Sequence, residues 1–121
     1  MYYQHLPLYL KLTTLLKNLY AIVHHLPKEY KFSLGSEIIS QNWELIDLFV
    51  EAQTSSEPTE KAQVNKARAI KQLSLAFDRF KIRIRFLGEL KLVSLGQLAS
   101  LNKRLEEIGK MIGSWQKHIS K

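Results

Sequence analysis

Hydrophobic residues recur at steps of three and four along most of this chain, and that spacing places them on one side of an α-helix. The pattern is most regular between Lys61 and Lys91. Its apolar positions there are Ile70, Leu73, Phe77, Phe80, Ile84 and Leu87. With about 100° between successive residues, these positions all fall within one sector around the helix axis that covers about a third of a turn or less. The sequence therefore predicts a long helix over 59–91 that buries one stripe in a core.

Three further segments carry the same periodicity. Their stripes are Leu8, Leu12, Leu15, Leu19, Ile22 and Leu26; then Leu34, Ile38, Leu45, Leu48 or Phe49, and Ala52; and finally Leu98, Leu101, Leu105, Ile108, Ile112, Trp115 and Ile119. They predict helices at about 7–26, 31–53 and 95–119. The connections between these helices are short, which makes consecutive helices antiparallel neighbours. The predicted fold is therefore all-α, a single domain over 1–121 forming an up-down-up-down four-helix bundle.

The predicted helix boundaries coincide with specific residue types. Pro27 ends the first helix because it lacks the amide hydrogen that a continuing helix requires. Segment 54–59, with the sequence TSSEPT, is typical of a loop, and both Ser56 and Thr59 are candidates to cap the helix that follows. Residues 94–97, Ser-Leu-Gly-Gln, have the form of a capping box.

Gly35, Gly109 and Gly113 stand inside predicted helices, where each costs about 1 kcal/mol relative to alanine. Gly35 in the second helix suggests a close approach of two helices. Gly109 and Gly113 lie four residues apart on one face of the last helix. They are either a local weakness or a groove in which another backbone packs closely, and we favour the groove. Trp115 on the same helix is a further packing candidate.

Positive charge is concentrated in the third predicted helix. The whole chain carries a formal net charge of +7. Residues 61–91 contain nine Lys or Arg and two Asp or Glu, whereas residues 1–60 have a net charge of −3 and residues 92–121 of +3. The candidate binding residues are Lys61, Arg68, Lys71, Arg79, Lys81, Arg83, Arg85 and Lys91. Such localised charge attracts polyanions, although a merely solvated helix face remains the alternative.

A second apolar row lies on the same helix and points away from the core stripe. It consists of Leu75, Ile82 and Phe86, which fall between the basic residues. A helix in a monomeric bundle needs one apolar stripe, so a second one predicts another surface to bury. The simplest partner is another copy of the chain, and these three residues are the predicted oligomer interface.

The sequence offers little to support catalysis. It contains no cysteine and no glycine-rich phosphate loop. The adjacent His24 and His25 point in different directions on a helix, as do Glu106 and Glu107, which disfavours a metal site or an acid–base pair. We therefore expect no catalytic residue, no metal and no cofactor. The aromatics Trp115, Tyr30 and Trp43 are candidates for base stacking, but in a bundle they are more often core or interface residues.

No apolar run approaches the roughly 20 residues that cross a membrane. The N-terminal segment has neither a basic start nor a small-residue cleavage site, which argues against a signal peptide. We therefore expect a cytoplasmic protein without a membrane partner.

The last helix contains the block Glu107-Ile108-Gly109-Lys110-Met111-Ile112-Gly113-Ser114-Trp115. It resembles the C-terminal signature of the accessory variability determinant (Avd) proteins of diversity-generating retroelements. These belong to a four-helix-bundle family that includes proteins encoded in ribosomal RNA intervening sequences. The segments 80–90, 26–28 and 34–38 are similar to further parts of that family. Lys110 and Ser114 depart from the pattern, which has Arg and Gly there.

The resemblance implies a non-catalytic protein that assembles into a pentameric ring with a basic surface. It further implies binding to a reverse transcriptase and to template RNA or cDNA, in support of mutagenic cDNA synthesis. Carried over to this sequence, Arg79, Lys81, Arg83 and Arg85 would face the polymerase or the RNA. Gly109, Gly113 and Trp115 would shape helix packing.

Three other functions stay open at the level of sequence. The first is a structural or protein-interaction bundle of the intervening-sequence type, without nucleic-acid function. The second is a membrane-surface protein that uses a basic amphipathic helix. The third is an enzyme with a bound metal or cofactor.

Overall fold

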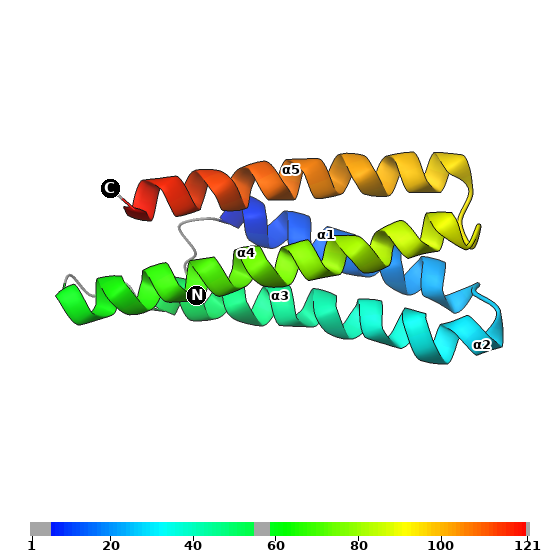
Figure 1. Cartoon of the computed structure of the whole chain (residues 1–121), viewed down its shortest axis with the longest axis horizontal. Coiled ribbons are helices and arrows are strands. Elements are labelled where there is room, and N and C mark those ends of the chain that lie inside the picture. The colour runs from blue at the N-terminus through cyan, green and yellow to red at the C-terminus, as the bar shows by residue number, and fades with distance from the viewer. Residues whose placement is uncertain (1–5, 55–58, 121) are drawn as a thin grey trace.

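The computed structural model describes residues 6–54 and 59–120, and within them it contains helices and no strand. The long helices are α1 (Leu6–His24), α3 (Ser36–Thr54), α4 (Glu60–Glu89) and α5 (Leu95–Ser120), and the short α2 (Lys28–Tyr30) and a π-helical turn, η1 (Lys31–Gly35), connect α1 to α3. α1 and α4 each pack against both α3 and α5 (Figure 1). This arrangement confirms the predicted all-α four-helix bundle.

The predicted stripes form the core. All six apolar positions of the α4 stripe are buried, and Phe49 rather than Leu48 fills the inner position of α3. On α5 the residues from Leu101 to Trp115 on the predicted stripe are also buried. The stripes are buried because a three-four spacing keeps every apolar side chain on the face that meets the other helices.

One polar side chain, Asn42, lies inside this apolar core at 0% exposure. Its amide Nδ2 donates a hydrogen bond to the carbonyl oxygen of Leu12 on α1, at 3.2 Å. A buried polar group favours the one alignment in which its partner is within reach. Asn42 therefore favours one alignment of α3 along α1.

The second predicted helix, 31–53, differs from the observed structure at its start. Helical structure begins at Lys28, and residues 31–35 form the π-helical turn before α3. Gly35 ends this turn and is buried. A Cβ atom added there would lie 2.8 Å from Val23 Cγ1 and 3.3 Å from the Tyr30 carbonyl oxygen. The close approach of two helices expected at Gly35 is thus confirmed.

We expect Gly35→Ala to destabilise the protein by about 1–3 kcal/mol, because the added methyl group overpacks the contact with α1. Gly113→Ala is the matched control, since nothing lies within 4 Å of a Cβ added at Gly113. That change should stabilise the isolated bundle by about 0.5–1 kcal/mol through helix propensity. Urea unfolding monitored by circular dichroism measures both. Equal effects of the two substitutions would contradict the packing assigned to Gly35.

Two predicted caps are confirmed. Thr59 Oγ1 accepts a hydrogen bond from the Ala62 amide at 3.1 Å, at the start of α4. At the start of α5, Ser94 Oγ accepts from the Gln97 amide at 3.0 Å and Gln97 Oε1 accepts from the Ser94 amide at 2.9 Å. These bonds satisfy amides that the first turn of a helix leaves without partners. The other cap candidate, Ser56, lies outside the described residues.

Candidate nucleic-acid interface

α4 presents two different faces, as its sequence predicts. Its core stripe points inward, whereas Leu75, Ile82 and Phe86 are 49%, 55% and 45% exposed. Val64, which the sequence pattern did not single out, is 53% exposed on the same outer side. The apolar row is therefore on the outside of the bundle, and its role as an oligomer interface stays a prediction.

The basic residues of α4 surround this apolar row. Those exposed to solvent are Lys61, Arg68, Lys71, Arg79, Lys81 and Arg85, followed by Lys91 just beyond the helix. Arg83 is half-buried instead. Lys66, a further cation of α4, is 7% exposed because it continues the core stripe, four residues before Ile70. Most of the cations of α4 are therefore exposed to solvent.

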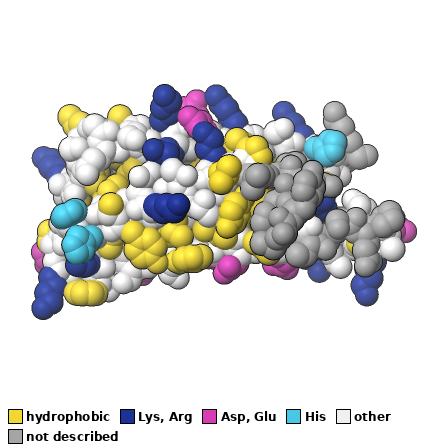
Figure 2. Space-filling view, turned by 180° about the vertical axis from the view of Figure 1, so that it is seen from behind, with side chains coloured by type: hydrophobic (Ala, Val, Ile, Leu, Met, Phe, Trp, Pro, Cys, Tyr) yellow, Lys and Arg dark blue, Asp and Glu magenta, His cyan; other side chains and the backbone are white. Residues whose placement is uncertain are grey.

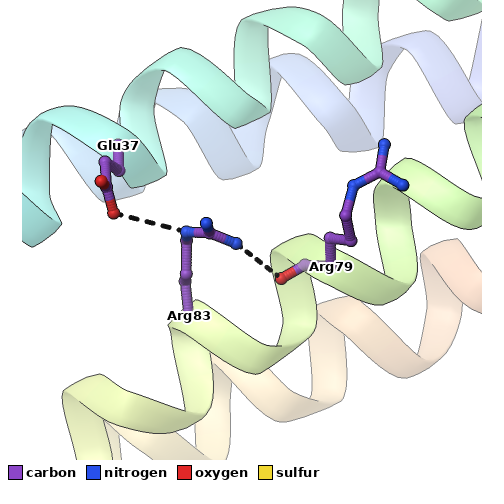
Figure 3. Close-up of polar contacts among 3 residues, drawn as sticks. All are labelled: Glu37, Arg79 and Arg83. Carbon is purple, nitrogen blue, oxygen red and sulfur yellow. Dashed lines mark hydrogen bonds and ion pairs between the residues drawn. The ribbon is translucent and has the colours of Figure 1, made fainter.

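Arg83 is occupied by a contact within the chain. Its Nε lies 3.4 Å from Glu37 Oε2 on α3, and one guanidinium nitrogen lies 3.5 Å from the Arg79 carbonyl oxygen (Figure 3). The guanidinium of Arg79 points away from Arg83 (Figure 3). Of the predicted binding residues, Arg83 therefore serves to join α4 to α3, and it is less available to an external phosphate.

Lys81 also has partners on its own helix. Its Nζ lies 3.3 Å from Asp78 Oδ1 and 5.1 Å from the centre of the Phe77 ring. By contrast, Lys71, Arg79 and Arg85 form no ion pair with any residue that the structure describes. Exposed ion pairs contribute little and exchange readily, so Lys81 stays accessible to a stronger anion. The unpaired side chains are the strongest candidates for phosphate contacts.

The cations divide between the two edges of α4. Arg85 and Lys81 line a groove of about 850 Å³ between α4 and α5, together with Lys110. Lys71 lies at a second contact between α4 and α5. Arg79 is one turn before Arg83, on the edge that meets α3. We refer to Lys71, Lys81, Arg85 and Lys110 as the α4–α5 basic strip.

The lining of the groove is partly apolar and contains two glycines. Phe77, Leu98 and Leu105 line it with Gly88 and Gly109, and the carboxylates Glu89 and Glu106 line it as well. Lys110 Nζ lies 3.3 Å from Glu106 Oε1 in an exposed ion pair. A Cβ atom at Gly109 would lie 3.3 Å from the Phe77 ring, and one at Gly88 would lie 2.6 Å from Leu98 Cδ2. These glycines allow α4 and α5 to approach each other closely, whereas Gly113 has open space around it. The close packing predicted at Gly113 is therefore not explained by contacts among the described residues and stays a prediction.

Lys91 occupies an unusual backbone position at the end of the basic helix. Its φ is 57°, in the left-handed region that favours glycine. The Lys91 amide donates to the Gly88 carbonyl oxygen and the Leu92 amide to that of Leu87, at 3.0 and 2.9 Å. This pattern is the Schellman motif that ends a helix. It projects a lysine at the end of α4, where the helix dipole also favours a cation.

The face opposite to α4 is less uniformly basic. Figure 2 shows hydrophobic side chains along the middle of that face, and most of its Lys and Arg side chains lie toward the margins. α1 contributes two cations, Lys11 and Lys17. The ammonium of Lys11 donates a hydrogen bond to Glu107 of α5, and this bond lowers the pKa of the Glu107 carboxyl. Lys11 of α1 is therefore paired with Glu107 of α5 at a partly exposed position.

The aromatic candidates for base stacking separate into buried and exposed ones. Trp115 is 2% exposed, and its ring centre lies 5.6 Å from that of Phe49, so it belongs to the core. Tyr30 is half-buried and packs against the core. Trp43 is 47% exposed, and its indole Nε1 donates to the Tyr20 hydroxyl at 3.0 Å. Of these rings, Trp43 alone stands largely on the surface.

Potential metal ligands are dispersed among the described residues. Within 6–54 and 59–120, no three His, Cys, Asp or Glu side chains gather to hold a metal ion. His24 and His25 meet edge to face, with ring centres 5.0 Å apart.

None of the helices in the described segments is long and apolar enough to span a bilayer.

A comparison with protein families bears on these features. A family model described as bAvd-like matches residues 8–119. The chain belongs to the bAvd-like family. This membership agrees with the resemblance seen in the block from Glu107 to Trp115, and it indicates an accessory role in a diversity-generating retroelement. Accessory proteins of the bAvd-like family are generally non-catalytic. No match was found among curated proteins or among solved structures.

Proposed function

We propose that this bAvd-like chain is a non-catalytic accessory protein that binds both a reverse transcriptase and nucleic acid in support of mutagenic cDNA synthesis. In this proposal it self-associates into a ring, as a pentamer, and acts in the cytoplasm. The observation that carries the nucleic-acid part is a pair of exposed cations on the α5 side of α4 that have no ion-pair partner among the described residues, Lys71 and Arg85.

The α4–α5 basic strip supplies the phosphate contacts. Lys81, Arg85 and Lys110 line the groove between α4 and α5, and Lys71 lies at a separate contact between the same two helices, so one strand of RNA or cDNA can meet several of these cations at once. Contacts to phosphate provide affinity without selecting a base sequence. That property suits a protein that must hold a template and its copy whatever they encode. Lys61, Arg68, Arg79 and Lys91 are further exposed cations outside this strip.

The test is a charge reversal on this strip. We expect Lys71→Glu with Arg85→Glu to lower the affinity for single-stranded RNA by about ten- to a hundredfold, because two phosphate contacts are replaced by repulsion. Fluorescence anisotropy with a labelled RNA measures the affinity, and co-purification measures binding to the reverse transcriptase. Both substituted side chains are exposed, so helicity should not change.

The matched control is Lys17→Glu with Lys28→Glu, which alters the net charge by the same amount at exposed positions on α1 and α2. It should reduce RNA affinity much less. Equal losses in the two variants would show that net charge alone governs binding. Weak binding that no substitution changes would instead favour the alternative function, a structural or protein-interaction bundle.

A further inference from the structure

α3 is the acidic helix of this basic protein. Residues 36–54 contain Glu37, Glu44, Asp47 and Glu51 and no Lys or Arg. Glu37 is paired with Arg83, but Glu44 and Asp47 are exposed and form no ion pair with a described residue. Residues 44 and 47 are three apart and share the outer surface of α3. An outer surface of this charge, on a chain of net charge +7, is suited to a basic partner.

An aromatic side chain borders these carboxylates. Trp43 lies one turn before Asp47, is 47% exposed, and is held by its hydrogen bond to Tyr20, which is 49% exposed. A tryptophan and a tyrosine fixed in this way lose little conformational entropy on binding, and both residue types are enriched at the centres of protein interfaces. The outer surface of α3 thus offers apolar area beside acidic groups.

The outer surface of α4 has the complementary chemistry. Leu75, Ile82 and Phe86 present apolar area, and Arg79 stands beside them without an ion-pair partner among the described residues. Two α4 helices meeting each other would place these cations opposite like charges, which is unfavourable. A contact between α4 of one copy and α3 of another instead joins apolar to aromatic area and cations to carboxylates.

We propose that copies of this chain associate head to tail, with the apolar row and Arg79 of α4 seated on Trp43, Glu44 and Asp47 of α3 in the next copy. This inference rests on the self-association in the proposed function and names the two surfaces that make it. In Figure 1, α4 runs across the front of the bundle and α3 along its lower edge, so one copy presents both surfaces at once. Because the two surfaces differ, each copy can contact the next one in the same way. The assembly closes into a ring when the rotation between successive copies permits it.

The contact leaves the α4–α5 basic strip open. Arg79 and Arg85 are six residues apart, which is about 120° round the helix axis. Arg79 lies on the α3 edge and Arg85 on the α5 edge. Self-association and phosphate binding therefore use opposite edges of the same helix.

The experiment uses two variants, each disabled on one surface. The α4 variant is Arg79→Glu with Ile82→Glu, and the α3 variant is Glu44→Lys with Asp47→Lys. All four positions are outside the core, and circular dichroism with thermal unfolding verifies the fold of each variant. Light scattering should show a multimer for the wild type and a monomer for each variant alone, with a dissociation constant raised at least about tenfold. An equimolar mixture should recover a complex of two copies, because each variant keeps the one surface that the other lacks and each copy can then make one contact.

A symmetric α4–α4 contact gives a different result. The α3 variant would then assemble as the wild type does, and mixing would produce no new complex; this outcome overturns the head-to-tail contact while self-association stands. A monomeric wild type at micromolar concentration would overturn self-association itself, together with this inference. RNA binding through the α4–α5 basic strip is measured separately by anisotropy, so its failure is distinguishable from either result.

Discussion

Replacing Phe49 with alanine is expected to lower the free energy of unfolding by about 3–5 kcal/mol. The Phe49 side chain is 0% exposed. Its ring centre lies 6.0 Å from that of Tyr9 on α1 and 5.6 Å from that of Trp115 on α5. Its removal would leave a cavity where three helices meet, and the loss is a large part of the roughly 5–15 kcal/mol by which a domain is stable.

Urea unfolding monitored by circular dichroism measures this effect. Phe32→Ala is the matched control, since it makes the same chemical change at a side chain that is 68% exposed. We expect that control to cost less than about 0.5 kcal/mol, as is usual for surface positions. The same small effect for both substitutions would contradict the buried position of Phe49 between α1 and α5.

The affinity of the wild-type protein for single-stranded RNA is expected to fall about 50-fold between roughly 50 and 200 mM salt. The α4–α5 basic strip offers about four phosphate contacts, and each contributes about 0.7 to the slope of log affinity against log salt for a single strand. The expected slope is therefore near −3. Each phosphate contact releases condensed counterions, and added salt makes that release less favourable.

Anisotropy titrations at several salt concentrations give the slope directly. The variant with Lys71→Glu and Arg85→Glu should show a slope smaller by about 1.4, because two contacts are lost. The Lys17→Glu and Lys28→Glu control should keep the slope of the wild type. An affinity that hardly depends on salt would point to stacking of bases on an exposed ring such as Trp43, and it would contradict binding through phosphates.

Local patterns in the sequence were sufficient for the four long helices and for the caps at the starts of α4 and α5. The spacing that begins at Ile70 predicted which face of α4 is buried, and the Ser94–Gln97 pair predicted the start of α5, because both depend on residues within one or two turns. The exposed position of Ile82 followed from the same periodicity. The burial of Lys66 could also have been predicted from this periodicity, since Lys66 stands seven residues before Leu73 on the core stripe.

Other features depend on contacts between distant segments. Asn42 lies in a gap in the α3 stripe, four residues after Ile38, but its bond to the Leu12 carbonyl exists only once α1 and α3 are paired. The close contact of Gly35, at the end of the π-helical turn, with Val23 likewise exists only once that turn packs against α1. No local pattern contains this information.

The sequence by itself determined four amphipathic helices, their caps, and the crowding of cations and a second apolar row onto α4, because each of these is a property of residues close together in the chain. The tertiary structure decided which cations remain available. Arg83 meets Glu37, forty-six residues away, while Arg79 and Arg85 are left without an ion pair among the described residues. An ion pair between helices depends on their register and rotation, which packing of the whole core sets.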